Sequence, residues 1–260
     1  MWGRSAKPEQ RIRQIYNTLS REWGAQHWWP AQSPFEVVVG AFLTQNTNWS
    51  NVELAIRQLR VAKVLSVAGI RKTPLNQLET LVRSSGYFRQ KAQRLKNFVS
   101  FLDEKYGGSM TKLLSRPTAE LREELLSLNG VGPETADSIL LYAGQHPVFV
   151  IDAYTRRVAA RHHIAPETAK YEELRTMFES ALRDVSASET RGTFLPEGAA
   201  HRPSAMSSAK RCSTAQVFNE MHGFMVGVGK NYCYKTRPHC ECCPLASLLP
   251  YANASAPARR

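Results

Sequence analysis

Apolar residues recur at intervals of three and four along most of the chain, the spacing that gathers them on one face of an α-helix. Such stripes occur in residues 33–45, 86–108 and 214–230. The first stripe is formed by Phe35, Val38, Val39, Phe42 and Leu43. Only residues 146–152, HPVFVID, look extended, and this stretch is short. The pattern therefore predicts an all-α protein.

Helix-terminal signals accompany these stripes. Ser33 can cap the amino end of the first striped helix, Pro34 suits its first position, and Glu36 would complete a capping box. A further helix is expected in residues 117–130, which begin with a proline and end with a glycine.

Residues 187–211 interrupt the helical pattern. They are rich in Ser, Ala, Gly and Pro and lack apolar periodicity. We predict a flexible insertion between two helices.

Charge suggests the class of partner. The chain has 260 residues, 43% of them hydrophobic, and a formal net charge of +12. A strong positive excess favours a polyanionic partner, because neutralised phosphates release counterions. Charge alone does not separate DNA, RNA, anionic lipid and a merely basic surface. No apolar run approaches the roughly eighteen residues of a membrane span, and the amino terminus lacks a signal-peptide core, so we expect a cytoplasmic protein.

The stretch LNGVG, residues 128–132, has two glycines and is followed by Pro133 at a helix start. Glycine permits a tight turn with positive φ, and backbone N–H groups at the start of the next helix can hold a phosphate. A plain helix–helix turn would have the same sequence. Asp152 follows, just before a helix in residues 153–162, where it can be a helix cap, a reactive carboxylate, or both.

Together these motifs resemble the helix-hairpin-helix element and catalytic aspartate of the endonuclease III superfamily of DNA glycosylases. Gly130, Val131 and Gly132 match the hairpin. Ile151, Asp152 and Arg157 match the segment around the aspartate. The similarity covers about residues 10–185 and 214–250.

The resemblance implies two helical lobes with a central DNA-binding cleft. One would be a six-helix lobe of residues 31–145, carrying the hairpin. The other would combine residues 1–30 and 146–250. The expected partner is double-stranded DNA with a damaged base, bound by a monomer that flips the target nucleotide out of the duplex.

The resemblance also assigns roles in catalysis. Asp152 would stabilise positive charge on the sugar while the base–sugar bond breaks. Members that also cut the DNA backbone carry a Schiff-base lysine eighteen residues before this aspartate, where this chain has Glu134. A carboxylate cannot form an imine, so we expect a glycosylase without lyase activity. Glu134 itself is otherwise an ordinary acid in a first helical turn, and a lysine elsewhere could substitute.

A second group of residues suggests the substrate. Gln45, in LTQNT, matches the family's glutamine that fills the gap left by the flipped base, or else caps a helix. The base-pocket candidates are Trp28, Trp29, Pro30, Trp49 and Lys230. They resemble the branch that removes 3-methyladenine, in which residues matching Trp28 and Trp49 sandwich the base. Cationic purines suit aromatic faces. Tandem tryptophans also mark ordinary cores, and Lys230 also suits a plain surface position.

Four of the five cysteines crowd near the carboxyl end. The spacing of Cys233, Cys240 and Cys243 resembles the loop that binds a 4Fe-4S cluster in endonuclease III relatives. Leu249 occupies the position of the fourth cysteine. Cys242 or the distant Cys212 could complete the set, His239 could help bind zinc, or the loop could be metal-free.

The leading hypothesis is a monofunctional base-excision-repair glycosylase for alkylated purines such as 3-methyladenine. A glycosylase for oxidised pyrimidines or mispaired bases is an alternative, against which the pair Trp28 and Trp49 argues. A non-catalytic module that binds DNA lesions is another, and Asp152 argues against it.

Overall fold

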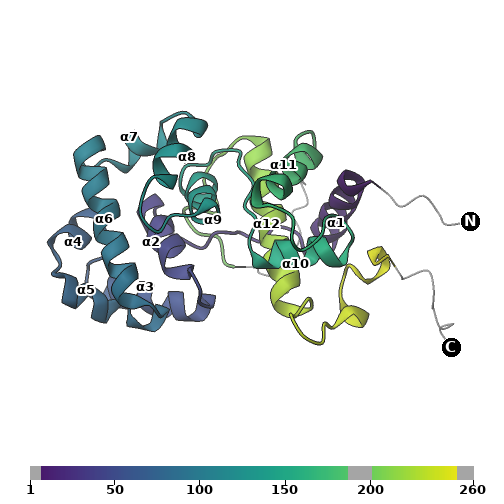
Figure 1. Ribbon diagram of the computed structural model, residues 1–260, viewed down its shortest axis with the longest axis horizontal. Helices are drawn as coiled ribbons and strands as arrows, with labels where there is room; N and C mark the ends of the chain where they lie inside the picture. The colour runs from purple at the N-terminus through teal and green to yellow at the C-terminus, as the bar shows by residue number, and fades with distance from the viewer. Residues whose placement is uncertain (1–6, 187–200, 251–260) are drawn as a thin grey trace, which may run out of the picture. The chain divides into compact units, whose positions relative to one another are not determined.

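The computed structural model describes residues 7–186 and 201–250, and within these ranges the regular structure is helical, without strands. Contacts divide the chain into two units (Figure 1). The terminal unit combines Met1–Pro30 with Pro147–Arg260, and the middle unit is Ala31–His146. The predicted all-α class is confirmed.

The middle unit contains eight α-helices in its described residues, rather than the six expected. They are α2 (Pro34–Thr44), α3 (Trp49–Val61), α4 (Val67–Lys72), α5 (Leu75–Leu81), α6 (Phe88–Tyr106), α7 (Met110–Leu114), α8 (Thr118–Leu126) and α9 (Pro133–Ser138). A 3₁₀ turn, η1 (Arg83–Ser85), precedes α6, and α9 continues into a π-helical turn, η2 (Ile139–Ala143). The number six came from the family resemblance, and the short helices α4 and α7 are among those that the structure contains.

Helix α2 is the centre of the middle unit. All its residues from Phe35 to Leu43 are buried, and it contacts α3, α6, α9 and η2 (Figure 1). A helix that is apolar around its whole circumference must be enclosed on all sides. Residues attached to the carboxyl end of α2 are therefore fixed relative to α9.

The start of α2 differs in part from the prediction. Ser33 caps the helix as expected, its hydroxyl accepting the Glu36 N–H at 3.2 Å. The carboxylate of Glu36 does not complete a capping box. It instead lies 2.7 Å from Arg60 of α3 and accepts the Gln32 N–H at 3.4 Å. The charge-assisted bond to Arg60 is the stronger interaction for a nearly buried carboxylate.

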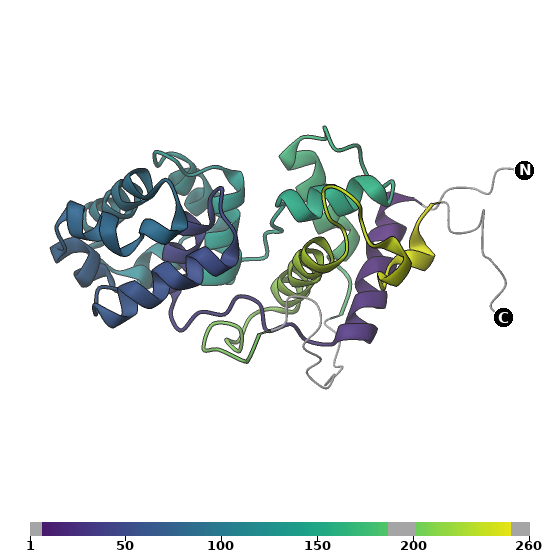
Figure 2. The same cartoon turned by 90° about the horizontal axis from the view of Figure 1, so that it is seen from below.

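The terminal unit is built from the two ends of the described chain. Its elements are α1 (Pro8–Trp23), α10 (Ala153–Arg161), α11 (Tyr171–Leu182), α12 (Ser213–Asn231), η3 (Cys240–Cys242) and η4 (Ala246–Leu248). Helix α1 contacts α11, α12 and η4, so it lies beside the carboxyl-terminal segment drawn in yellow (Figure 2). Helix α12 contacts α1, α10 and α11 and forms the core of the unit.

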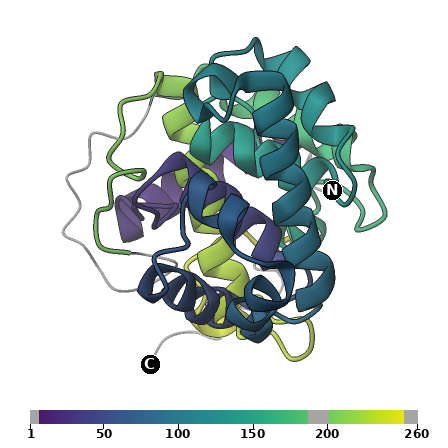
Figure 3. The same ribbon diagram turned by 90° about the vertical axis from the view of Figure 1, so that its left-hand side faces the viewer.

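The predicted flexible insertion is only partly described. Residues 187–200 lie outside the described part of the chain, whereas residues 201–211 pack against the terminal unit (Figure 3). His201 donates its backbone N–H to the Gln26 carbonyl at 3.0 Å, and Met206 is buried. Residues 201–211 thus make contacts with the first segment of the chain, and the flexibility of the insertion stays a prediction. Their partners lie some 175 positions earlier in the chain, as for Ser204 and Trp29, so no local pattern reveals them.

Among the described helices, none is both long enough and apolar enough to cross a membrane.

A charged side chain lies in the core of the middle unit. Lys91 of α6 is only 1% exposed, and its Nζ donates to the carbonyls of Leu43 at 2.8 Å and Ser85 at 2.6 Å. The ammonium thus serves the end of α2 and the end of η1 together. Burial, helped by the nearby charge of Arg94, lowers the pKa of Lys91 to about 8.

The pKa of Lys91 predicts a distinctive alkaline stability profile. Above about pH 8 the folded protein releases this proton, whereas the unfolded chain keeps it up to about pH 10.4. The unfolded state then binds more protons, so the free energy of unfolding gains up to about 1.4 kcal/mol per pH unit from this group. Urea unfolding at pH 7 to 10 should show the stability of the natural protein rising relative to Lys91→Met across that window. A pH-independent difference between the two proteins would contradict the assignment.

Candidate active site

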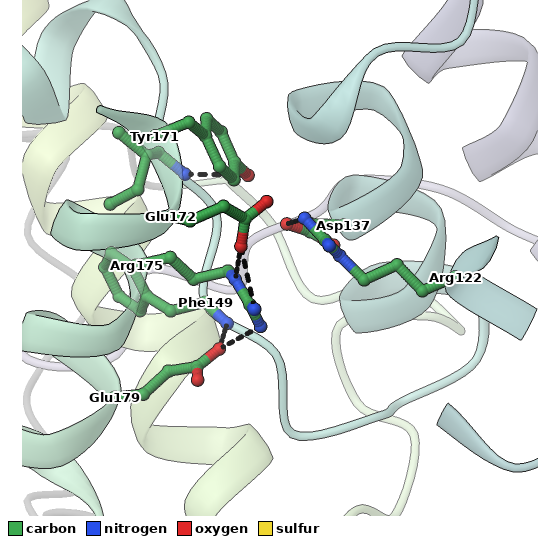
Figure 4. A network of polar contacts seen from close by, with 8 residues as sticks. Arg122, Asp137, Phe149, Tyr171, Glu172, Arg175 and Glu179 are labelled. Atoms are coloured by element: carbon green, nitrogen blue, oxygen red, sulfur yellow. Dashed lines mark hydrogen bonds and ion pairs between the residues drawn. The ribbon is translucent and has the colours of Figure 1, made fainter. Parts of the chain in front are cut away.

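Residues 148–151 form a buried, extended segment that leads to Asp152. No sheet is available to bond its backbone in the described structure, and a buried unpaired N–H group is costly. Side chains of α11 bond this backbone instead (Figure 4). Glu179 accepts the Phe149 N–H at 2.9 Å, and the Tyr171 hydroxyl accepts the Ile151 N–H at 3.3 Å. The segment is thereby fixed immediately before the candidate catalytic residue.

Glu179 is itself held by an arginine. Arg175 lies 3.1 Å from Glu179 and 2.8 Å from Glu172, all on α11 (Figure 4). These pairs are spaced four and three residues apart, so they face one another on the helix. Their orientation keeps the Glu179 carboxylate directed at the Phe149 backbone.

Asp152 is the N-cap residue of α10. Its Oδ1 accepts the Thr155 N–H at 2.7 Å, which fixes the direction of the side chain. Its Oδ2 lies 3.6 Å from Nε2 of His222, and the side chain is 13% exposed. The cap and the reactive carboxylate inferred from the sequence are therefore compatible, because one oxygen caps the helix while the other faces His222.

His222 was not among the sequence candidates. It projects from α12, is 4% exposed, and its ring lies 6.5 Å from that of Trp28. Burial lowers its pKa, and the charge of Asp152 opposes that shift only in part. A neutral imidazole leaves the carboxylate charge in place at neutral pH. A single histidine in an apolar helical stripe gives no sequence signal for this position.

The hairpin joins α8 and α9 in the middle unit. Gly130 has φ of +80°, and the Val131 N–H bonds to the Leu128 carbonyl at 3.1 Å. Gly132 is the N-cap residue of α9. Arg122 on α8 forms a bidentate pair with the fully buried Asp137 of α9, at 2.6 Å and 3.1 Å (Figure 4). This pair braces the helices on both sides of the turn.

Gln45 contacts the hairpin directly. Its Nε2 donates to the Gly130 carbonyl and to the Thr135 hydroxyl, each at 2.9 Å. Its Oε1 accepts from Arg94, another residue that sequence analysis did not single out. A gap-filling role would require Gln45 to release these bonds, so that role stays a prediction.

Glu134 lies exposed in the first turn of α9. An acidic residue there interacts favourably with the helix dipole, which is the ordinary structural role considered for it. The position expected for a Schiff-base lysine in lyase-competent relatives is thus occupied by an accessible carboxylate.

The base-pocket candidates are divided between the two units. Trp28 and Trp29 are buried in the terminal unit, with ring centroids 5.4 Å apart. Trp49 is half-buried in the middle unit, at the first position of α3. Pro30, half-buried, ends the first segment of the terminal unit, and Lys230 is exposed in the last turn of α12. The sandwich of Trp28 and Trp49 stays a prediction.

The cysteine candidates all belong to the described residues and are free thiols. Cys233 is buried and Cys240 and Cys243 half-buried, whereas Cys212 and Cys242 are exposed. His239 packs its ring against Tyr234 at 5.0 Å. In residues 7–186 and 201–250, no three His, Cys, Asp or Glu side chains gather as a site for a single metal ion. Burial raises the pKa of Cys243 to about 11, so a bound metal would have to displace its proton.

Comparison with known proteins identifies the family. Residues 39–184 match the HhH-GPD superfamily of base excision DNA repair proteins. The chain belongs to this superfamily. It is 39% identical over 237 residues to Methanocaldococcus jannaschii MJ1434, to which a DNA repair glycosylase activity is ascribed. The match covers 90% of this chain and 93% of that protein. The sequence-based family assignment is thus confirmed, and the chain is a DNA glycosylase of base excision repair.

Solved structures of DNA glycosylases resemble this chain in fold. The H. pylori 3-methyladenine DNA glycosylase MagIII, bound to 1,N6-ethenoadenine, is 26% identical, with a TM-score of 0.67. The similarity covers 86% of this chain and 98% of MagIII. A covalent endonuclease III–DNA complex is 21% identical and superposes with a TM-score of 0.70, covering 95% of this chain and 97% of that one. The latter likeness establishes the fold alone.

The two hairpin glycines should differ in their tolerance of alanine. A Cβ on Gly130 would lie 2.0 Å from Nε of Arg94, and the φ of +80° disfavours any side chain. A Cβ on Gly132 would meet nothing within 4 Å. Gly130→Ala should therefore lower the free energy of unfolding by about 1–2 kcal/mol, and Gly132→Ala by no more than about 0.5 kcal/mol. Thermal and urea unfolding of both variants provide the measurement, and equal losses would refute the distinction.

Proposed function

We propose that this HhH-GPD protein is a monofunctional DNA glycosylase that releases alkylated purines such as 3-methyladenine and leaves an abasic site. The observation that carries the proposal is Asp152, whose Oδ1 is fixed by the Thr155 N–H while its Oδ2 faces His222 at 3.6 Å. The likeness to MagIII, a 3-methyladenine DNA glycosylase, supports the substrate class.

The proposed reaction uses the carboxylate as an electrostatic stabiliser. As the bond between the purine nitrogen and C1′ breaks, its electrons leave with the base and positive charge builds on the sugar. Asp152 stabilises that charge and orients a water molecule toward C1′. Water adds its oxygen to C1′ and passes a proton to the Asp152 carboxylate, which returns it to solvent. The cationic purine takes the bonding electrons and leaves as a neutral base, and the other product is an abasic sugar. A neutral His222 leaves the carboxylate its full charge.

Two features support the absence of lyase activity. Glu134 cannot form an imine with the sugar, because imine formation needs a free amine. Lys91 is enclosed in the middle unit with its amine bonded to two carbonyls, so it is not an accessible nucleophile. Among the base-pocket candidates, Lys230 of α12 carries an exposed amine. A test of lyase activity therefore has to ask whether Lys230 forms the imine.

Aromatic residues support an alkylated purine as substrate. Such a purine carries positive charge, and aromatic faces attract cations by about 0.5–2 kcal/mol, depending on desolvation. Trp28 and Trp49 are the candidates for contacting its two faces. The glycosidic bond of a cationic purine is already weakened, so the reaction does not require a strong general acid, and we assign none.

The reaction is tested by base release from methylated duplex DNA. Asp152→Asn is a suitable variant, because asparagine also caps helices well and should leave the fold stable. The natural protein should release 3-methyladenine, and the variant should be slower by about 100-fold or more. Strand breaks should appear only after alkali. Release of oxidised or mispaired bases instead would overturn the substrate class, and tight binding without any release would favour a lesion-binding module.

DNA binding through the hairpin gives a separate prediction. The backbone at Gly132 is open, so a phosphate can approach it closely. Gly132→Ala should keep the stability of the natural protein yet bind duplex DNA several-fold more weakly in a fluorescence-anisotropy titration. Unchanged affinity at matched salt would exclude a phosphate contact at this residue.

A further inference from the structure

The second carboxylate oxygen of Asp152 faces a buried imidazole. Oδ1 accepts the Thr155 N–H at 2.7 Å, whereas Oδ2 lies 3.6 Å from Nε2 of His222. This separation is longer than that of a formed hydrogen bond, in which nitrogen and oxygen lie about 2.7–3.2 Å apart. Hydrogen bonds in active sites are often long in the free enzyme and shorten in the complex with substrate. The two groups are therefore close enough to form a hydrogen bond after a small movement.

The position of His222 is fixed by aromatic neighbours. Its side chain is 4% exposed, and its ring centroid lies 6.5 Å from that of Trp28 and 6.4 Å from that of Phe149. Phe149 in turn stacks on Phe178 of α11, with ring centroids 4.8 Å apart. The extended segment that leads to Asp152 thus also supports the histidine.

Gly223, the next residue of α12, brings the helix close to the segment that carries Trp28. A Cβ on Gly223 would lie 3.2 Å from Cβ of Trp28 and 3.4 Å from Cβ of Gln26. Because glycine has no side chain, the segment can lie directly against α12 at this point. This close packing beside His222 limits the movement of its ring.

The contact with Asp152 indicates which ring nitrogen of His222 carries the proton. A neutral imidazole has one N–H and one nitrogen lone pair. A lone pair on Nε2 would face the lone pairs of Oδ2 and repel them. A proton on Nε2 instead points a donor at the carboxylate without adding charge, and the hydrogen bond then favours this tautomer. The Thr155 N–H and the His222 Nε2–H would together fix both oxygens of Asp152.

Other titratable groups around His222 have partners of their own. Glu220, two residues earlier on α12, accepts the hydroxyl of Tyr16 on α1 at 2.8 Å. Glu179 of α11 is paired with an arginine of the same helix. His201 packs its ring against one of the tandem tryptophans. Burial lowers the pKa of His222, and the carboxylate at the start of α10 is the charge that opposes this shift.

We propose that His222 is the positioning residue for Asp152, and that its neutral Nε2–H directs Oδ2 while leaving the carboxylate its negative charge. This inference rests on the catalytic role proposed for Asp152. Protonation of His222 would place a cation beside the carboxylate and offset the charge that stabilises the sugar. Base release should therefore decline as the pH falls through the pKa of His222.

Single-turnover release of 3-methyladenine from methylated duplex DNA tests this role. His222→Phe suits the aromatic surroundings but removes the donor, so at neutral pH it should react about tenfold more slowly with unchanged affinity for DNA. His222→Gln keeps an N–H donor and cannot titrate. It should retain most of the natural rate at neutral pH and lose less of it on acidification. His201→Phe removes a different imidazole and should keep the pH profile of the natural protein.

The tautomer gives a second readout that needs no substrate. The ¹⁵N NMR signals of His222, identified by their loss in His222→Gln, should show the proton on Nε2 at neutral pH. The pKa of His222 should lie below about 6.5, because burial lowers it. Asp152→Asn should lower this pKa further, because it removes the negative charge that opposes the shift.

Three results would overturn the positioning role. The first is a folded His222→Phe, as judged by circular dichroism, with the rate and pH profile of the natural protein. The second is a His222→Gln variant as slow as His222→Phe, which would assign the effect to packing of the ring. The third is a proton on Nδ1 together with a pKa that Asp152→Asn leaves unchanged. If the natural protein releases no 3-methyladenine, the proposed substrate class fails, and the NMR result still decides whether His222 donates to Asp152.

Discussion

An extended backbone that is buried away from any sheet must find its hydrogen-bond partners among side chains, and this requirement determines the position of Asp152. Glu179 and Tyr171 bond to alternate backbone N–H groups of the segment that precedes it. The helix α10 then begins at Asp152, with the Thr155 N–H fixing the carboxylate. The position of the Asp152 carboxylate thus depends on polar contacts made by α11.

The hairpin of the middle unit follows a similar principle. Its turn needs a glycine at positive φ. The turn alone would only weakly fix the angle between the two helices that it joins. The buried pair of Arg122 and Asp137 connects the flanking helices, and Gln45 links the end of α2 to the Gly130 carbonyl. Contacts from three helices therefore fix the turn whose backbone we propose to contact a phosphate.

Local patterns predicted the features that depend on neighbouring residues. The Ser33 cap, the turn at Gly130 and the capping position of Asp152 each follow from a few adjacent residues, and the structure contains all three. The family motifs identified the superfamily for the same reason. Contacts between distant residues were not predictable. Arg60 forms a hydrogen bond with Glu36, which lies 24 positions earlier in the chain. His222 lies close to Asp152, which is 70 positions earlier. No periodicity in the sequence indicates either contact.

Helix α10 separates Asp152 from the start of the cysteine loop by a fixed number of residues. Its amino end carries Asp152, and Arg157 and Arg161, one turn apart on a single face, bond to the segment that begins the cysteine loop. Each residue of an α-helix turns by about 100° around the axis. Inserting or deleting one residue between Asp152 and Arg157 would rotate both arginines away from their partners, or rotate the aspartate away from His222. The length of this interval is therefore constrained by the contacts at both ends of the helix at once.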